Sequence, residues 1–215
     1  MGKRNFINSI LQNTCRPEGF FGRMILRGMN YGHRPLAKWG MSNLVWQPEW
    51  KVLDIGCGGG ANLAELLKRC SRGIVYGVDI SPESVLFARK KNRKLLGSRC
   101  FVEEGGAGKL PFADQTFDAV TAFETVYFWG DLSRTFAEVA RVLKEEGSFL
   151  ICNEMSDPSN EQWTSRIEGM VVYSAEELAS SLTNAGFGDV SVSRQRTENM
   201  CLVARKQTCR KKGEE

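Results

Sequence analysis

The residues best suited to chemistry in this 215-residue sequence surround a glycine-rich segment. Asp54 stands two residues before Gly56 in the run DIGCGGG (residues 54–60), and Asp79 ends the next apolar run. Glycines allow a tight strand-to-helix turn and let a ligand lie against the main chain at the helix N-terminus. A carboxylate at Asp79 can accept hydrogen bonds from both hydroxyls of a ribose. In this order the features predict a nucleoside-binding unit.

Two cofactor classes use such a unit, dinucleotides such as NAD and S-adenosylmethionine (SAM). The spacing Gly56-x-Gly58-x-x-Ala61 also fits the dinucleotide pattern. Asp54 argues against NAD, because a negative charge there is unfavourable beside a pyrophosphate and favourable beside the sulfonium and amino groups of SAM. An NAD oxidoreductase therefore stays a minor alternative, which a titration with a nicotinamide cofactor would separate.

The elements that position these residues follow from short apolar runs alternating with amphipathic helices. This alternation is typical of βαβ units that form a parallel sheet. Strands are predicted at Lys51–Ile55, Gly73–Val78, Arg99–Val102, Phe117–Ala122, Ser148–Cys152, Asp189–Arg194 and Met200–Arg205. Helices are predicted at Ala61–Cys70, Pro82–Leu96, Leu132–Leu143 and Ala175–Ala185. The short gap between the last two strands permits only an antiparallel turn.

The predicted fold class is therefore α/β, a Rossmann-like, doubly wound and mostly parallel seven-stranded sheet whose last strand is antiparallel. Residues 1–44, rich in aromatic residues and methionine, have the three-to-four residue apolar spacing of short helices and are predicted to form an N-terminal helical lid. Residues 45–207 form the nucleoside-binding domain, and residues 208–215 a frayed tail of basic and acidic residues.

At these motifs the sequence resembles the class I SAM-dependent methyltransferases, in particular the small-molecule group similar to the ubiquinone-biosynthesis methyltransferases. The resemblance covers residues 51–150 and rests on the DIGCGGG run, on Asp79, and on the run LPFADQTFD at residues 110–118. It implies SAM as cofactor and S-adenosylhomocysteine as product. The cofactor contacts that it implies are Asp54, Gly56, Cys57, Gly58, Gly60, Asp79, Ile80, Gly106, Ala107 and Phe123.

One position departs from the family pattern. The family places an aspartate about five residues before the proline of the LPF run, where it binds the adenine amine, and this chain has Gly106 there. Backbone groups of Gly106 and Ala107, or the nearby Glu104, are the candidates to replace it. The loss of one exposed hydrogen bond costs about 0.5–1.5 kcal/mol, so SAM binding is expected to be weakened and not abolished.

The candidate catalytic residues are Tyr31, His33, Glu124 and Tyr127. His33 is the only histidine and the best candidate base, while Glu124 and Tyr127 follow the fourth strand, where the acceptor should meet the methyl group. Core packing is the competing interpretation for the aromatic residues here, and a surface or capping role for His33. The expected reaction is in-line displacement, in which the protein chiefly positions the two reactants.

Composition narrows the remaining classes. Seven cysteines without a C-x-x-C pair and a single histidine predict reduced thiols and no metal site. No apolar stretch reaches the roughly 18 residues of a spanning helix, and residues 1–11 lack a signal peptide, so the sequence predicts no membrane insertion and a cytoplasmic location. Monomer and homodimer are both left open.

Three other interpretations of the function remain open beside that of a small-molecule methyltransferase. A net charge of +4, with basic residues at 89–99 and 205–212, leaves an RNA or tRNA methyltransferase open, although nucleic acid is the less favoured partner. Gly106 leaves a non-catalytic SAM-binding protein open. The NAD oxidoreductase is the third.

Overall fold

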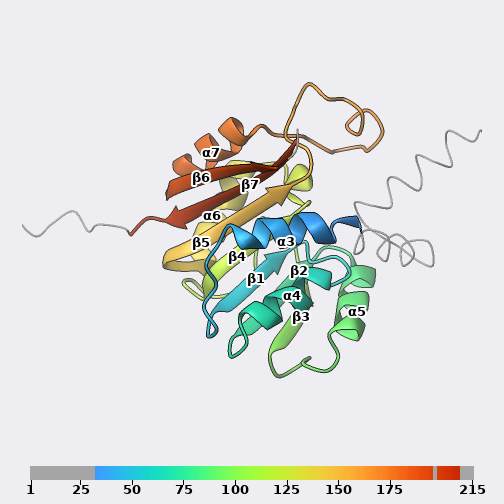
Figure 1. Cartoon of the computed structure of the whole chain (residues 1–215), viewed down its shortest axis with the longest axis vertical. Helices are drawn as coiled ribbons and strands as arrows, with labels where there is room; N and C mark the ends of the chain where they lie inside the picture. The colour runs from blue at the N-terminus through green and yellow to red at the C-terminus, as the bar shows by residue number, and fades with distance from the viewer. Residues whose placement is uncertain (1–31, 196–197, 209–215) are drawn as a thin grey trace, which may run out of the picture.

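The computed structural model describes residues 32–195 and 198–208. A seven-stranded sheet with strand order β3-β2-β1-β4-β5-β7-β6 forms its centre (Figure 1). The strands are β1 (Lys51–Ile55), β2 (Ile74–Asp79), β3 (Cys100–Glu104), β4 (Phe117–Phe123), β5 (Leu143–Asn153), β6 (Phe187–Gln195) and β7 (Asn199–Lys206). Neighbours from β3 through β5 pair in parallel, and β7 is antiparallel to both β5 and β6. The predicted fold class is confirmed.

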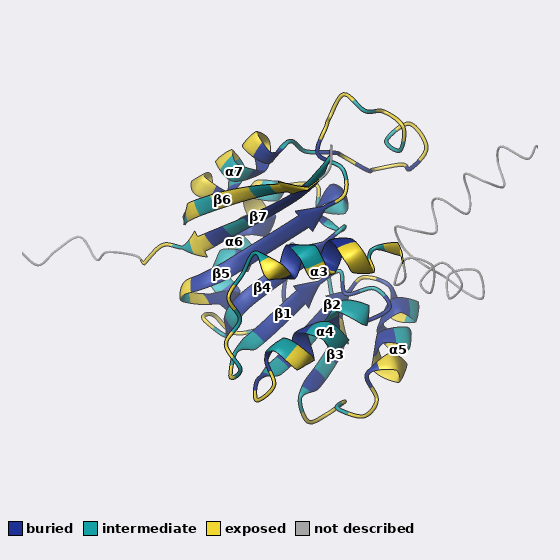
Figure 2. Cartoon of the chain, viewed as in Figure 1, coloured by how far each residue is buried: buried dark blue, intermediate teal, exposed yellow. Residues whose placement is uncertain are grey.

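Helices cover both faces of the sheet (Figure 1). One face packs against α3 (Arg34–Ser42), α4 (Ala61–Arg69) and α5 (Pro82–Lys91), the other against α6 (Leu132–Val142) and α7 (Ala175–Asn184). A short 3-10 turn, η1 (Val126–Phe128), follows β4. Two apolar cores result, one on each side of the sheet, and burial is deepest along the central strands (Figure 2).

Helix α5 shows how the sequence sets an element's ends. Its N-terminus is as predicted, because the Ser81 hydroxyl accepts the N–H of Ser84 at 3.3 Å and Pro82 occupies the first turn. Its C-terminus is not, since the helix ends at Lys91 and not at Leu96. The Asn92 side chain bonds the carbonyls of Ala88 and Gly60, each at 3.0 Å. This bond to the glycine turn is a tertiary contact that the helical spacing alone did not indicate.

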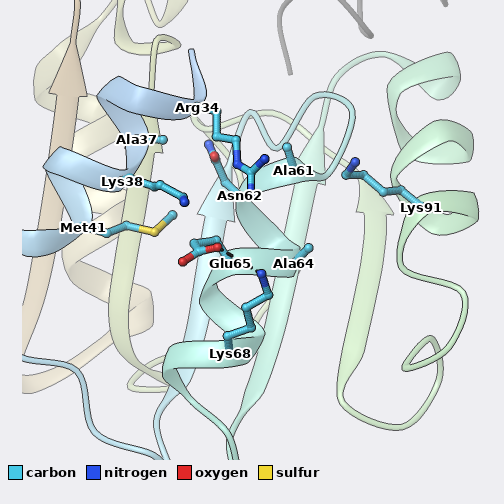
Figure 3. Close-up of a pocket in the computed structure, with 10 residues that line it drawn as sticks. All are labelled: Arg34, Ala37, Lys38, Met41, Ala61, Asn62, Ala64, Glu65, Lys68 and Lys91. Carbon is cyan, nitrogen blue, oxygen red and sulfur yellow. Dashed lines mark hydrogen bonds and ion pairs between the residues drawn. The ribbon is translucent and has the colours of Figure 1, made fainter. Parts of the chain in front are cut away.

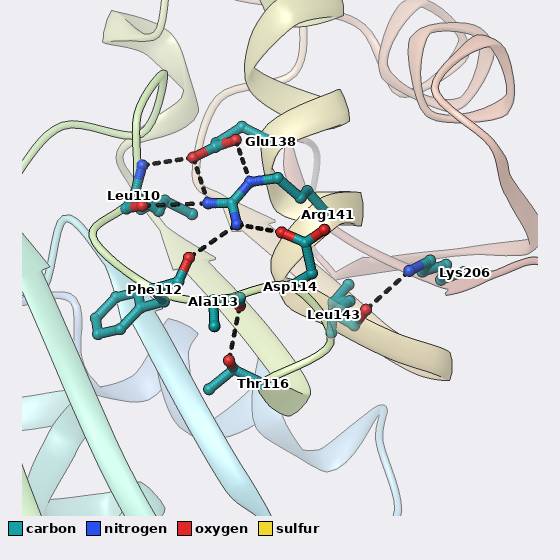
Figure 4. Close-up of polar contacts among 9 residues, drawn as sticks. All are labelled: Leu110, Phe112, Ala113, Asp114, Thr116, Glu138, Arg141, Leu143 and Lys206. Atoms are coloured by element: carbon teal, nitrogen blue, oxygen red, sulfur yellow. Dashed lines mark hydrogen bonds and ion pairs between the residues drawn. The ribbon is translucent and has the colours of Figure 1, made fainter.

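The LPF run is held in place by one arginine (Figure 4). Arg141 of α6 donates to the carbonyls of Leu110 and Phe112 at 3.2 and 2.8 Å, and to Asp114 at 2.7 Å. Glu138 accepts from the Arg141 guanidinium at 2.8 Å and from the N–H of Leu110 at 2.6 Å. The acids and carbonyls of this run thus fasten the chain before β4 to helix α6.

Helix α3 packs closely against the sheet because it has a glycine, Gly40, at the contact. The thiols of Cys152 and Cys201 donate to the carbonyls of Leu36 and Gly40 at 3.7 and 3.6 Å, and a Cβ at Gly40 would lie 2.6 Å from the Cys152 sulfur. Residues 32–44 of the predicted lid therefore include a helix that packs closely on the sheet. Residues 1–31 and 209–215 lie outside the described residues, and the domain division stays a prediction.

Candidate functional site

The candidate site lies where the carboxyl ends of β1 and β4 meet. From β1 the chain continues to β2 on one side, whereas β4 leads to β5 on the other. Between strands whose connections run to opposite sides, the loops separate and leave a crevice, which is where open α/β sheets bind ligands. Every predicted site residue in the described ranges lies at or after the carboxyl end of a strand at this edge, or precedes α3.

The glycine turn after β1 has the left-handed backbone that the sequence predicts. Gly56, Gly58 and Gly60 have φ values of +72°, +49° and +71°. A Cβ at Gly56 would overlap the Thr125 side chain, and one at Gly60 would lie 2.8 Å from the Ala88 backbone. At Gly58, by contrast, the space beyond the backbone is open within 4 Å. The turn therefore presents its main chain at Gly58 to a ligand.

Asp54 is buried at the end of β1, with 1% of its surface exposed. Its Oδ1 accepts a hydrogen bond from the Thr121 hydroxyl at 2.7 Å, and β-sheet register places Thr121 directly beside it on β4. Within the described residues Oδ2 has no hydrogen-bond partner. Burial raises the pKa of Asp54 to about 7; the Thr121 bond lowers it and the charge of Asp79 adds to the rise. A buried carboxylate oxygen in this state favours a cationic partner.

Asp79 ends β2 and closes the other side of the turn. Its Oδ2 accepts the N–H of Gly58 at 2.8 Å and its Oδ1 accepts the N–H of Ser81 at 2.9 Å. Burial raises the pKa of Asp79, while these backbone bonds and Ser84 oppose the rise. A carboxylate oxygen has more than one acceptor direction, so both oxygens remain able to accept from a ligand hydroxyl.

A pocket opens between the glycine turn, the end of β4 and the start of α3. Of the predicted residues, His33, Gly56, Cys57, Gly58, Phe123 and Glu124 line it. Arg34 and Asn62 line it too, and sequence reasoning missed both. Their signal was weak, because one belongs to the N-terminal segment and the other to the first turn of α4. The pKa of the Cys57 thiol is raised well above its usual value, chiefly by burial, which makes it an unreactive wall of the pocket.

Three further predicted contacts gather beside β2 and β3. Ile80 is 49% exposed, an unusual state for a large apolar side chain, and a Cβ at Gly106 would lie 3.6 Å from it. Gly105 donates to the Asp79 carbonyl at 3.0 Å and joins the two loops. The Ala107 side chain packs against the core, which leaves only its backbone for a ligand. Ile80 and Gly106 therefore lie next to each other, with much of the Ile80 side chain exposed.

His33 and Glu124, which line the pocket, form a cluster with Glu154. Their ligand atoms all lie within 4.8 Å of one another, and His33 Nε2 is 4.0 Å from Glu154 Oε2. Burial lowers the pKa of His33, with Glu154 opposing, so the imidazole is neutral near pH 7 and can accept a proton. The sequence predicts no metal, yet these three groups are of a kind that could ligate one, a juxtaposition that residue spacing did not reveal.

Glu124 is held in its position by its neighbours. It adopts φ +58°, and its N–H donates to the Cys152 carbonyl at 3.0 Å. Its Oε1 accepts the N–H of Glu154 and the hydroxyl of Tyr127, the latter at 3.4 Å. Burial, offset by the Glu154 N–H bond, raises the pKa of Glu124 to about 8.

The other two predicted catalytic residues differ in what the structure says of them. Tyr127 is 2% exposed, and its hydroxyl also accepts the N–H of Met155 at 2.9 Å. Burial raises the pKa of Tyr127 well above its usual value, so it is placed to orient Glu124 and not to exchange protons at neutral pH. Tyr31 lies outside the described residues.

Comparison with known proteins assigns this domain. The methyltransferase domain family matches residues 53–151, the stretch that carries β1, the glycine turn, β2 and β4. The resemblance to the methyltransferases that the sequence motifs indicate is thereby confirmed for these residues.

A curated relative gives the extent of the likeness. Demethylmenaquinone methyltransferase of Chlorobaculum parvum is 32% identical over 153 residues, which is 71% of this chain and 61% of the relative. The chain thus spans less than two thirds of that relative's length.

Solved structures agree in fold. A SAM-dependent methyltransferase from Aquifex aeolicus superposes with a TM-score of 0.71 at 22% identity, over 85% of this chain and 97% of that one. Geranyl diphosphate C-methyltransferase from Streptomyces coelicolor, in complex with S-adenosylhomocysteine, superposes with a TM-score of 0.69 at 16% identity, over 80% and 76%. In the described part of this chain, no helix is both long and apolar enough to cross a membrane.

Proposed function

We propose that this protein is a SAM-dependent methyltransferase that transfers a methyl group to a small-molecule acceptor by in-line displacement. The observation that carries the proposal is the buried Asp54, whose Oδ2 has no partner among the described residues and which stands two residues before the glycine turn. A cationic ligand that rests on the turn would satisfy this oxygen, and SAM is such a ligand.

In this proposal, different residues at and around the turn contact different parts of the cofactor. Asp54 faces the positively charged sulfonium and amino groups of SAM. Arg34 is the cation available to the carboxylate of the methionine part of SAM. Asp79 accepts from the ribose hydroxyls, and Ile80 with Gly106 packs against the adenine. When bound, SAM supplies an already activated methyl group, so no covalent enzyme residue is needed.

The acceptor side has a base and a group that orients the reactants. His33 is neutral and partly exposed, so it can take a proton from an acceptor hydroxyl, amine or acidic carbon. Glu124, oriented by Tyr127, faces the same pocket. The relatives reported above are named for small-molecule substrates, which supports a small-molecule acceptor over RNA.

Calorimetric titration with SAM and with S-adenosylhomocysteine tests the cofactor assignment. Wild-type protein should bind both, and Asp79→Ala should weaken both affinities at least tenfold because two ribose hydrogen bonds are lost. Glu176→Ala, which removes an exposed acid of α7, is the matched control and should change neither. Equal affinities for wild type and Asp79→Ala would contradict the ribose contact. A metabolite screen with methyl-labelled SAM then identifies the acceptor.

A further inference from the structure

A second hollow adjoins the cofactor pocket. It has a volume of about 360 Å³ and lies along α4, between α3 and the end of α5 (Figure 3). Arg34, Ala61 and Asn62 line both this groove and the cofactor pocket, so the two are continuous. We call it the α3–α4 groove. A ligand seated there would reach the cofactor pocket at Arg34.

Positive charge dominates the α3–α4 groove. Arg34 and Lys38 extend from α3 toward α4, Lys68 points up from α4, and the Lys91 amine points from α5 toward the start of α4 (Figure 3). Glu65 is the one carboxylate among the residues that line the groove.

The charge of Glu65 is already shared. Its oxygens lie 3.4 Å from Lys68 Nζ and 3.9 Å from Arg69 Nη2. Within the described ranges Arg34, Lys38 and Lys91 form no ion pair. Three cations on two helices therefore face one hollow whose single carboxylate is already paired with other cations. Like charges held together in this way favour an anionic occupant.

The N-terminal residues outside the described ranges are a poor source of that counter-charge. Residues 1–31 contain a single acid, Glu18, and five basic residues: Lys3, Arg4, Arg16, Arg23 and Arg27. Whatever position this segment takes, it brings a net positive charge. An external anion is the occupant that the charges favour.

Two more features define the kind of anion. The first turn of α4 has no side-chain cap at Gly60, so its first N–H groups have no side-chain acceptor, and Ala61 at this positive end of the helix lines the hollow. The floor includes the methyl groups of Ala37 and Ala64 and the thioether of Met41. A site with several cations, free N–H groups and an apolar floor suits a multiply charged phosphate attached to an apolar body.

We propose that the α3–α4 groove binds the phosphate or diphosphate group of the methyl acceptor. The inference rests on the proposed function and narrows the acceptor to a phosphorylated small molecule. Lys38 and Lys91 bind the anion from opposite sides, and Arg34 connects the anion site to the cofactor pocket.

Calorimetry on the full chain with inorganic pyrophosphate tests the groove. Wild type should bind pyrophosphate more tightly than phosphate, and acetate should bind too weakly to detect. The double variant Lys38→Gln/Lys91→Gln should lose at least tenfold in pyrophosphate affinity. The matched double variant Lys90→Gln/Lys109→Gln removes two exposed lysines that do not line the groove and should stay within twofold of wild type.

SAM titration of the same variants separates this proposal from the previous one. SAM affinity should be unchanged in both double variants, because neither changes a cofactor contact. Equal pyrophosphate affinity in both double variants would overturn the phosphate site, as would acetate binding equal to that of pyrophosphate. A single-stranded RNA oligonucleotide that binds the wild type more tightly than pyrophosphate, and loses affinity in Lys38→Gln/Lys91→Gln, would assign the groove to RNA instead. Failure of the wild-type protein to bind SAM would instead contradict the proposed function.

Discussion

Asp54 is an ionisable group in a place where ionisation is costly. It is 1% exposed, and one oxygen has a hydroxyl partner while the other has none among the described residues. Its pKa of about 7 lies above the usual aspartate value of 3.8 because the folded, cofactor-free protein disfavours the charged form. A bound cation reverses this preference. Binding of SAM and ionisation of Asp54 are therefore linked.

SAM affinity is expected to depend on pH through this residue. With a pKa of about 7, roughly a tenth of Asp54 is ionised at pH 6 and about nine tenths at pH 8, so SAM should bind about tenfold more weakly at pH 6. Calorimetric titrations at half-unit pH steps measure this. Asp54→Asn should bind SAM weakly and lose that part of the pH dependence. A wild-type affinity that is constant from pH 6 to 8 would contradict the role of Asp54.

The raised pKa of Asp54 also makes the stability of the folded, cofactor-free protein depend on pH. An acid whose pKa is higher in the folded state than in the unfolded state binds more protons when folded. This contribution to stability is present below pH 4 and is lost as the pH rises toward 7. The cofactor-free protein carries this cost at neutral pH, and the cation of the cofactor would offset it.

At the scale of the element, the glycine turn after β1 depends on two separate constraints. One is the left-handed backbone, shared by Gly56 and by Gly130, which have φ values of +72° and +64°. The other is close approach, which of these two glycines only Gly56 has, because a Cβ there would overlap the Thr125 side chain that follows β4. Around Gly130 the space is open within 4 Å. A comparison of Gly56 with Gly130 therefore separates the cost of a left-handed backbone from the cost of close contact.

Alanine substitutions at these two glycines should differ in cost. Gly130→Ala should lower the free energy of unfolding by about 1 kcal/mol, which is the cost of a left-handed alanine. Gly56→Ala adds overlap with Thr125 and should cost about 3 kcal/mol. Urea denaturation followed by circular dichroism measures both. Equal losses would mean that the approach of the turn to Thr125 does not constrain the fold.

At the scale of the whole molecule, helix α3 connects the far side of the sheet to the pocket. Gly40 allows the helix to touch β5 and β7, and His33 stands at the other end of α3, next to Glu154. A helix moves largely as a rigid body, so displacement at Gly40 should be felt at His33. The position of the candidate base is thus decided by packing well over one helical turn away.

Gly40→Ala should change the titration of His33. The added Cβ would meet the Cys152 sulfur at 2.6 Å and push α3 away from the sheet, which exposes the imidazole and moves its pKa back up toward 6.5. His33 is the only histidine in the chain, so proton NMR follows it without assignment ambiguity. The control is Gly32→Ala, where the space is open. A His33 pKa unchanged by Gly40→Ala would show that α3 does not set it.

The sequence by itself determined the order of the elements and the cofactor edge of the sheet. The DIGCGGG run, Asp79 and the alternation of strands and helices are local signals, since a glycine needed for its backbone angle or a strand-end acid is visible within a few residues. The family and its cofactor followed from these motifs. The predicted end of α5 was wrong, because the hydrogen bond from Asn92 to Gly60 joins residues that are 32 positions apart in the sequence.

Only the tertiary structure decided which side chains meet. Thr121 reaches Asp54 through strand register, Tyr127 and the Glu154 backbone position Glu124, and Lys38 and Lys91 line the same groove. Apart from Tyr127, which lies three residues after Glu124, these partners are far apart in sequence, and no spacing marks them. Burial, which sets the pKa of Asp54 and of His33, likewise depends on the packing of helices against the sheet. Local patterns specify backbone geometry, whereas the electrostatics of a site arise from contacts that exist only once the chain has folded.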